Sequence, residues 1–179
     1  DIENPSNFCS EIKKLLKPQG IWVVEFAYLP SVLQNLAYDG IVHEHLCLYS
    51  LSTFEPLIRK NHLKIFNVQE NDTNGGSLQV WITYEENNLY DNKQNKENIF
   101  KLKIKEFDLS LDDLATYTRF EIRVKNHKQE LVELLHTIKK QGKKIHIYGM
   151  STKLNTILNY CNIGPEIIDF AAERSPEKW

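Results

Sequence analysis

Three ionisable side chains stand in a row inside an apolar run, and any fold of this chain has to accommodate them. The run spans residues 40–51, and the three side chains are His43, Glu44 and His45. Burying such groups without partners costs kilocalories each, so the fold must either satisfy them or use them. An imidazole titrates near neutral pH, and a neighbouring carboxylate raises its basicity or fixes its tautomer. The triplet therefore predicts either a general base with a supporting acid or a satisfied core histidine beside a surface glutamate.

A metal site is a third interpretation of the same stretch. On an extended segment, His43, His45 and Cys47 would point to one side and offer the nitrogen and sulfur ligands that zinc accepts. The other cysteines, Cys9 and Cys161, stand alone, and no second cluster of histidine and cysteine follows at ligand spacing. We therefore assign no metal site and keep a metal-dependent hydrolase as a minor alternative.

Composition excludes several classes of partner. The 179 residues are 41% hydrophobic and 26% charged, and the net charge of −2 provides no basic surface for nucleic acid or a membrane. No apolar run approaches the length of a membrane span, and no signal peptide opens the chain. The three cysteines form an odd, widely spaced set, which indicates free thiols in a reducing compartment. We expect a cytoplasmic protein that binds neither nucleic acid nor membranes.

The first part of the chain predicts a buried sheet with helices. Asn4–Pro5 has the pattern of a helix N-cap followed by proline in the first turn, and the apolar run 21–26 is typical of a parallel strand buried on both faces. The capping-box spacing Ser52–Glu55 predicts a helix over about 52–61. Further elements expected here are a short helix over 31–38, a strand over 63–68, and a strand over 78–84 with the alternation of an antiparallel neighbour.

The second part predicts a long helix followed by a strand–helix–strand unit. Residues 87–98 are polar and aperiodic, so we expect an exposed loop there. Apolar residues that recur every seven positions predict an amphipathic helix over about 111–140, with His127 at the edge of the core. A strand over 144–149, a helix and a strand over 167–171 then form a βαβ unit, whose first turn lies where α/β folds bind ligands.

Three motifs, in order along the chain, together resemble the sugar C-methyltransferases. They are residues 38–46 with 49–51, residues 74–78, and residues 148–153 with Asn155 and 158–161. Members of this family are S-adenosylmethionine-dependent enzymes that act on nucleotide-linked keto-sugars in the biosynthesis of branched deoxysugars. The similarity runs from end to end of the chain.

The resemblance implies an α/β fold in which this chain is the central-to-C-terminal portion of a longer enzyme. Residues 1–86 would be the C-terminal part of a class I methyltransferase (Rossmann-like) domain, 87–110 a linker, and 111–179 a second, incomplete Rossmann-like domain that binds substrate. The cofactor would be S-adenosyl-L-methionine, with its main binding motif upstream of this chain, and zinc would be confined to a region further upstream. The partner would be a small-molecule nucleotide-sugar.

The resemblance also implies roles for individual residues. His45 would be the base that removes a proton beside the keto group, and Glu44 would orient it or take part in the proton transfer. The turn at Gly75–Gly76 would lie against the same pocket, although the two glycines by themselves favour a simple turn. Tyr49 would form a polar pocket wall or a packed aromatic. The residues expected to bind substrate are His43, Tyr49, Asn74, Gly75, Gly76, Ser77, Gly149, Ser151, Lys153 and Asn155.

Three positions depart from the family pattern. Val42 stands where a tyrosine often precedes the acidic pair, Asn74 where histidine is common, and Leu154 where glycine usually follows the lysine. These departures do not change the expected reaction class, but they bear on which sugar is the substrate. The rival function from another class is a non-catalytic nucleotide-sugar binding module.

Overall fold

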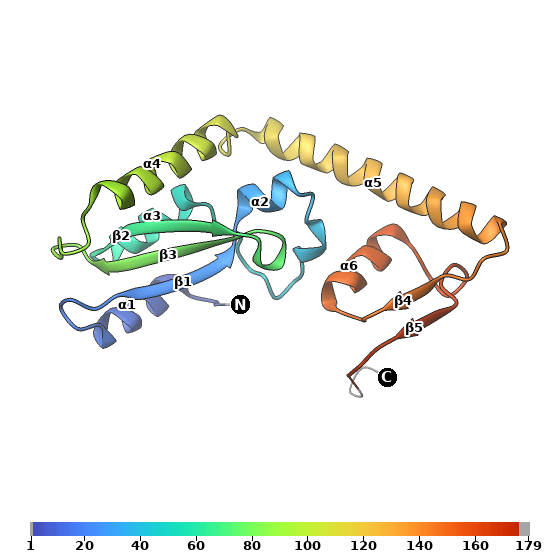
Figure 1. Ribbon diagram of the computed structural model, residues 1–179, viewed down its shortest axis with the longest axis horizontal. Helices are drawn as coiled ribbons and strands as arrows, with labels where there is room; N and C mark the ends of the chain where they lie inside the picture. Colours follow the sequence, from blue (N-terminus) through green and yellow to red (C-terminus); the bar gives the residue numbers. More distant parts are fainter. Residues whose placement is uncertain (1, 176–179) are drawn as a thin grey trace. The chain divides into compact units, whose positions relative to one another are not determined.

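The computed structural model describes residues 2–175 as a mixed α/β structure that divides into two compact units. Unit 1 comprises the chain up to Ala37 together with Leu46–Thr116. Unit 2 comprises Tyr38–His45 and the chain from Tyr117 onward. The segment that carries the ionisable triplet is therefore part of the unit that the second half of the chain builds. Figure 1 labels the helices and strands of both units.

Unit 1 is built on a three-stranded antiparallel sheet with the strand order β1-β3-β2. Alternate side chains of β1 (Trp22–Ala27) are half-buried and exposed, and Val24 lies opposite Val80 of β3 (Ser77–Tyr84). The antiparallel pairing predicted from the alternation of β3 is confirmed. The parallel strand buried on both faces is wrong for β1, because the core covers one face only and leaves Val23 46% exposed.

Helices α1 and α3 pack against each other, and α3 also packs on β2 (Leu63–Asn71). α1 (Pro5–Leu15) begins as predicted, since the Asn4 side chain accepts a hydrogen bond from a backbone N–H at 3.0 Å. α3 (Leu51–Lys60) has its capping box at Ser50 and Thr53, two residues before the predicted position. The short helix α2 (Leu29–Gln34) follows β1 directly.

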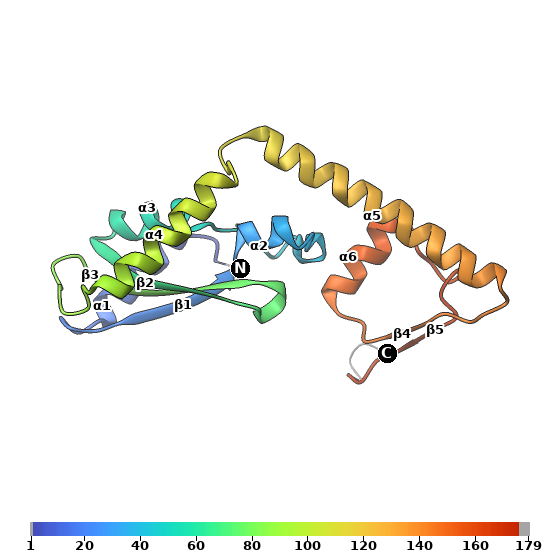
Figure 2. The ribbon, with the colours of Figure 1, turned by 45° about the horizontal axis from the view of Figure 1, so that its top comes forward.

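Helix α4 (Lys93–Asp108) corrects the prediction of an exposed loop over 87–98. The Asn92 side chain caps the helix by accepting a hydrogen bond from the Asn95 N–H at 2.9 Å, and α4 then packs along β2 (Figure 2). Leu102 and Glu106 are the two buried residues of α4. The sequence pattern missed the helix because its first turns are polar and its core contacts come only later.

Unit 2 contains a parallel pair of short strands joined by a helix. β4 (His146–Tyr148), α6 (Thr152–Cys161) and β5 (Phe170–Ala172) form the predicted βαβ unit, with β5 about three residues later than expected. The long helix α5 (Leu114–Lys140) is also confirmed, and it packs on a small core formed by Cys161, Ile163 and Ile167. Among residues 2–175, no helix has the length and apolar character needed to cross a membrane.

Candidate active site

The segment Tyr38–His45 is wound into two consecutive turns. It opens with the 3-10 helix η1 (Tyr38–Gly40). The His45 N–H then donates to the Val42 carbonyl at 3.0 Å and closes a second turn, with residues 43–44 at its centre. The whole ionisable triplet is exposed, so the alternative of a satisfied core histidine is wrong.

The ring of His45 is oriented by the backbone of its own loop. Its Nδ1 lies 2.7 Å from the Gly40 carbonyl oxygen. A carbonyl oxygen only accepts, so Nδ1 carries the proton in this contact, and Nε2 is the unprotonated nitrogen of the neutral ring. An exposed imidazole whose tautomer is fixed in this way presents a single lone pair to a ligand. This is the arrangement that a general base requires.

Glu44 does not contact the His45 ring through any hydrogen bond that the structure records, and its carboxylate faces solvent at the tip of the turn. The orienting contact belongs to the Gly40 carbonyl instead. A part for Glu44 in the proton transfer itself stays a prediction. His43, beside it in the turn, is exposed in the same way.

The turn also bears on the metal interpretation. His43 stands at the centre of a turn, so the alternation of an extended strand does not apply to His43, His45 and Cys47, and their expected common side is wrong. Across residues 2–175, no group of three or more histidine, cysteine, aspartate and glutamate side chains is placed to bind a metal ion.

Tyr38 is the one buried side chain of the segment Tyr38–His45. Its hydroxyl oxygen lies 3.0 Å from Nδ1 of His127 on α5 and 3.8 Å from Sγ of Cys161 on α6. Burial raises the pKa of Tyr38, and the Cys161 thiol adds to the shift, so the hydroxyl keeps its proton. The predicted place of His127 at the edge of the core is confirmed, since its side chain is half-buried.

Tyr49 lies in unit 1 as a packed aromatic. Its ring makes edge-on contacts with Phe26 and Phe54, with centroid distances of 5.7 and 5.4 Å. Its backbone bridges to Tyr28, the residue after β1. Burial, followed by the nearby Cys47 thiol, raises the pKa of Tyr49 to about 12. The geometry therefore favours packing over a polar pocket wall.

The Gly75–Gly76 turn joins β2 to β3 and approaches another part of unit 1 closely. A Cβ on Gly76 would stand 2.4 Å from the Cβ of Ser31 on α2, and the Asn35 side chain donates to the Gly75 carbonyl at 2.9 Å. The close backbone approach is thus made to α2. Ser77 is buried, and its hydroxyl donates to the carbonyl of Thr73 at 3.0 Å.

Asn74 precedes these glycines in the same turn, with a positive φ of 54° and an exposed side chain. Unit 1 therefore brings together Asn74, Gly75, Gly76 and Ser77 as predicted neighbours, but the contacts recorded for the last three are internal to the fold. Binding of substrate by this set stays a prediction.

The turn between β4 and α6 gathers the remaining predicted residues in unit 2. Gly149 has a φ of +85°, with open space where a Cβ would stand, and Ser151 caps α6 by accepting from the Leu154 N–H at 3.2 Å. The Met150 N–H donates to the carboxylate of Glu173 at 2.7 Å. A phosphate that took this N–H would have to displace Glu173, a residue that follows β5 and that the sequence motifs did not single out.

Lys153 and Asn155 lie in the first turns of α6, where Lys153 is half-buried and Asn155 exposed. The positive charge of Lys153 therefore stands near the N-terminus of α6. Both features favour an anion at this end of the helix.

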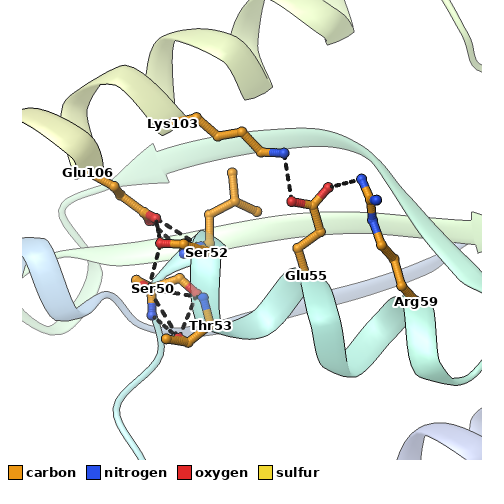
Figure 3. A network of polar contacts seen from close by, with 8 residues as sticks. Ser50, Ser52, Thr53, Glu55, Arg59, Lys103 and Glu106 are labelled. Carbon is orange, nitrogen blue, oxygen red and sulfur yellow. Dashed lines mark hydrogen bonds and ion pairs between the residues drawn. The ribbon is translucent and has the colours of Figure 1, made fainter. Parts of the chain in front are cut away.

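Glu106 of unit 1 has a buried carboxylate that binds the first residues of α3 (Figure 3). It accepts hydrogen bonds from the Tyr28 hydroxyl at 2.8 Å and the Leu51 N–H at 2.5 Å. It also accepts from the N–H of Ser52 at 2.8 Å and from the Ser52 hydroxyl. Burial and the hydrogen bond to Glu106 raise the pKa of Tyr28. Glu106 thus caps the N-terminus of α3 from a helix far away in the sequence.

A second contact in the same network joins the two helices at the surface. Lys103 of α4 pairs with Glu55 of α3 at 2.6 Å, and Glu55 also pairs with Arg59 at 2.7 Å (Figure 3). Burial alone raises the pKa of Glu55, but these two cations outweigh it and hold the pKa below its ordinary value. The sequence offers no local signal for the contact between α3 and α4, because Lys103 and Glu55 are far apart in the chain.

The described residues do not fit a cradle for S-adenosylmethionine. Such a cradle needs a glycine-rich strand-to-helix turn, and β1 passes into α2 through Tyr28 without a glycine. Gly149 is a single glycine at the corresponding turn of unit 2. No step of a reaction is therefore assigned to the cofactor within residues 2–175.

Comparison with known proteins identifies the family of this chain. The family model described as C-methyltransferase C-terminal domain matches residues 72–179, a range that contains the turn at Gly149 and begins after the triplet. The C-methyltransferase NovU of Streptomyces niveus is 26% identical over 162 residues, which are 90% of this chain and 38% of that protein. The chain thus spans well under half of the relative's length. Because the family model covers more than half of the chain, the chain belongs to the C-methyltransferase C-terminal domain family.

Proposed function

We propose that this chain is part of an S-adenosylmethionine-dependent methyltransferase, which adds a methyl group to the carbon beside the keto group of a nucleotide-linked deoxysugar. Membership of the C-methyltransferase C-terminal domain family supports the reaction class. The observation that carries the proposal is the exposed His45 ring, whose Nδ1 is tied to the Gly40 carbonyl and whose Nε2 is left to accept a proton.

His45 is the general base in this proposal. A keto group acidifies the neighbouring carbon, which makes its proton available to an imidazole base. The electron pair of the C–H bond moves into the enolate, and the proton moves to Nε2 of His45. S-adenosylmethionine, held outside residues 2–175, would supply the electrophilic methyl group.

The contact to Gly40 also serves the charged state of the base. After proton transfer both ring nitrogens carry protons, and the Gly40 carbonyl still accepts from Nδ1. Glu44, one residue away, places a carboxylate in the same exposed turn, and its part in the proton transfer is proposed without a direct hydrogen bond to the ring.

The turn between β4 and α6 is the proposed contact for the substrate diphosphate. Gly149, Ser151 and Lys153 offer a close backbone approach, a helix N-terminus and a cation. The Glu173 carboxylate accepts a hydrogen bond from the Met150 N–H. When the nucleotide binds, Glu173 has to release this N–H, or it accepts a hydrogen bond from a substrate hydroxyl group. The further residues proposed to bind substrate in unit 2 are His43 and Asn155. In unit 1, binding of substrate by Tyr49, Asn74, Gly75, Gly76 and Ser77 stays a separate prediction.

The proposal extends to the rest of the protein. Unit 1 would be the end of a Rossmann-like methyltransferase sheet, in which the edge of β1 pairs with a strand outside this chain. The S-adenosylmethionine motif and a zinc-binding region would also lie outside it. Cys9, Cys47 and Cys161 are free thiols, which supports a reducing, cytoplasmic location.

The alternative is a non-catalytic nucleotide-sugar binding module. One experiment separates the two functions. The full-length protein is incubated with S-adenosylmethionine carrying a 13C-methyl group and with a nucleotide-linked keto-sugar, and the product is examined by NMR. We expect the labelled methyl on the carbon beside the keto group, and we expect His45→Gln to abolish turnover while substrate still binds.

Substrate binding without any methyl transfer by the wild-type protein would instead establish the binding module. Hydrolysis of the substrate by a preparation that contains stoichiometric metal in elemental analysis would establish the hydrolase.

A further inference from the structure

The side chain of Tyr38 is enclosed by three others in unit 2. It packs edge-on against the rings of His127 and Tyr160, with centroid distances of 5.6 and 5.5 Å. Its hydroxyl lies 3.0 Å from His127 Nδ1 and 3.8 Å from Cys161 Sγ. At 6% exposure, Tyr38 is the point where the segment Tyr38–His45 is fixed to α5 and α6.

Short backbone contacts lead from Tyr38 to the His45 ring. The Ile41 N–H donates to the Tyr38 carbonyl at 3.0 Å, and the Val42 N–H donates to the Gly40 carbonyl at 3.1 Å. That same Gly40 carbonyl accepts from His45 Nδ1. The position of Nε2 is therefore set by a wound stretch of backbone whose one buried side chain is Tyr38.

Helix α6 connects this anchor with the other candidate site of unit 2. Tyr160 and Cys161 stand at its C-terminal end, and Ser151 caps its N-terminal end beside the Gly149 turn. A ten-residue α-helix is about 15 Å long. Helix α6 thus carries Tyr160 and Cys161, which contact Tyr38, at one end, and the turn proposed to bind the diphosphate at the other end.

We propose that Tyr38 is the positioning residue of the His45 loop. Its side chain, held by His127, Tyr160 and Cys161, fixes the loop on the same helix that presents the diphosphate turn. The base then sits at a set place relative to a substrate whose nucleotide is held by unit 2. Tyr38 touches no reacting atom in this arrangement and acts through Gly40 and the His45 ring. This inference rests on the proposed function of His45.

The test uses Tyr38→Phe and Tyr38→Ala in the full-length protein, with Tyr160→Phe as the matched control. Tyr38→Phe keeps the ring packing and removes the hydroxyl contacts to His127 and Cys161. Tyr160→Phe also removes one hydroxyl from the cluster, but it keeps the ring that faces Tyr38 and all hydroxyl contacts of Tyr38. Two quantities are measured for each variant. They are hydrogen–deuterium exchange of the peptide covering residues 39–46, and kcat and KM for methyl transfer.

We expect Tyr38→Phe to lower kcat about ten-fold, the size of one lost hydrogen bond, with KM unchanged and faster exchange in 39–46. Tyr38→Ala should show the same pattern with larger changes, and Tyr160→Phe should match the wild type. Unchanged exchange in 39–46 for both Tyr38 variants would overturn the anchor. Faster exchange with unchanged kcat would overturn the positioning role.

The same data keep this inference apart from the function of His45. If His45→Gln turns over like the wild type, His45 is not the base, and Tyr38 then has no base to position. Exchange in 39–46 still reports whether Tyr38 holds the loop. A Tyr38→Ala protein that loses exchange protection throughout α5 and α6 has unfolded unit 2, and the decision then rests on Tyr38→Phe.

Discussion

Glu106 of unit 1 and the ionisable triplet of unit 2 differ in how far they are exposed to solvent. In unit 1, the Glu106 carboxylate is 4% exposed and meets donors from Tyr28, Leu51 and Ser52. In unit 2, the His43-Glu44-His45 triplet is exposed, and within residues 2–175 it contributes one side-chain hydrogen bond, from His45 to its own loop. Satisfied, buried polar groups specify and stabilise a fold, whereas exposed ones cost it little and remain available to a ligand. The comparison predicts that substitutions in the first set change stability and substitutions in the second set change activity.

The largest expected effect on stability is that of Glu106→Ala. It leaves a buried hydroxyl and two N–H groups of α3 without their acceptor, so we expect unit 1 to lose about 4 kcal/mol of unfolding free energy. Native-state hydrogen exchange of the β2 and β3 amides in the intact protein measures this loss. Glu97→Ala on the same helix is the control, because Glu97 pairs only loosely with Lys93 at 3.7 Å, and it should cost under about 0.5 kcal/mol. Equal effects of the two variants would break the comparison.

Gly76→Ala should follow in size. Its φ of +126° disfavours any side chain, and the new Cβ would stand 2.4 Å from the Ser31 Cβ, so we expect a loss of about 3 kcal/mol. Gly75→Ala shares the positive φ but has open space at the Cβ position, and it should cost only about 1 kcal/mol. Exchange of the β3 amides distinguishes the two. A larger cost at Gly75 would mean that the approach to α2 is not what requires glycine.

His45→Ala tests whether an exposed residue of unit 2 contributes little to stability. The ring is exposed and its one hydrogen bond is local, so the unfolding free energy of unit 2 should change by less than about 0.5 kcal/mol. The exchange rates of α5 and α6 amides provide the measurement. A loss of several kcal/mol would place His45 among the structural residues and remove the reason to regard it as a base.

The smallest effect is expected for the surface pair Lys139–Asp169 in unit 2. The Ile145 N–H, followed by Lys139, holds the pKa of Asp169 below its ordinary value. A depressed carboxyl pKa stabilises the folded state above the ordinary value of about 3.9, and this contribution disappears as pH falls through the folded-state pKa. Asp169→Asn should therefore lower the melting temperature of unit 2 slightly at pH 7 and by progressively less as the pH falls through the folded-state pKa. Glu130→Gln, an exposed residue of α5, is the control. A deficit that persists unchanged at low pH would exclude the carboxylate as its source.

Local sequence signals predicted the elements that local contacts form. The Asn4 cap and the βαβ unit of 146–172 were predicted because cap, period and turn residues lie next to one another in the chain. Helix α4 was missed, since what holds it are Leu102 and Glu106 against partners far away in the sequence. For the same reason, the apolar run of β1 did not reveal that only one of its faces is covered.

The candidate site shows the same limit. The residue types of the triplet predicted a base or a satisfied core histidine, and it was the resemblance to a family that singled out His45 as the base candidate. What fixes the ring, the Gly40 carbonyl, and what holds the loop, Tyr38, depend on how the turns fold. The resemblance to a family includes Tyr38 in a motif without giving it a role.

The account is tested most directly by proton removal in the absence of methyl transfer. The full-length protein, with S-adenosylhomocysteine in place of the methyl donor, is incubated with the nucleotide-linked keto-sugar in D2O, and deuterium on the carbon beside the keto group is followed by NMR. We predict that the wild type catalyses this exchange and that His45→Gln slows it by about 10²–10⁴-fold. His136→Gln, which changes another exposed histidine of unit 2, should leave the rate unchanged. Exchange at the wild-type rate in His45→Gln would contradict the account.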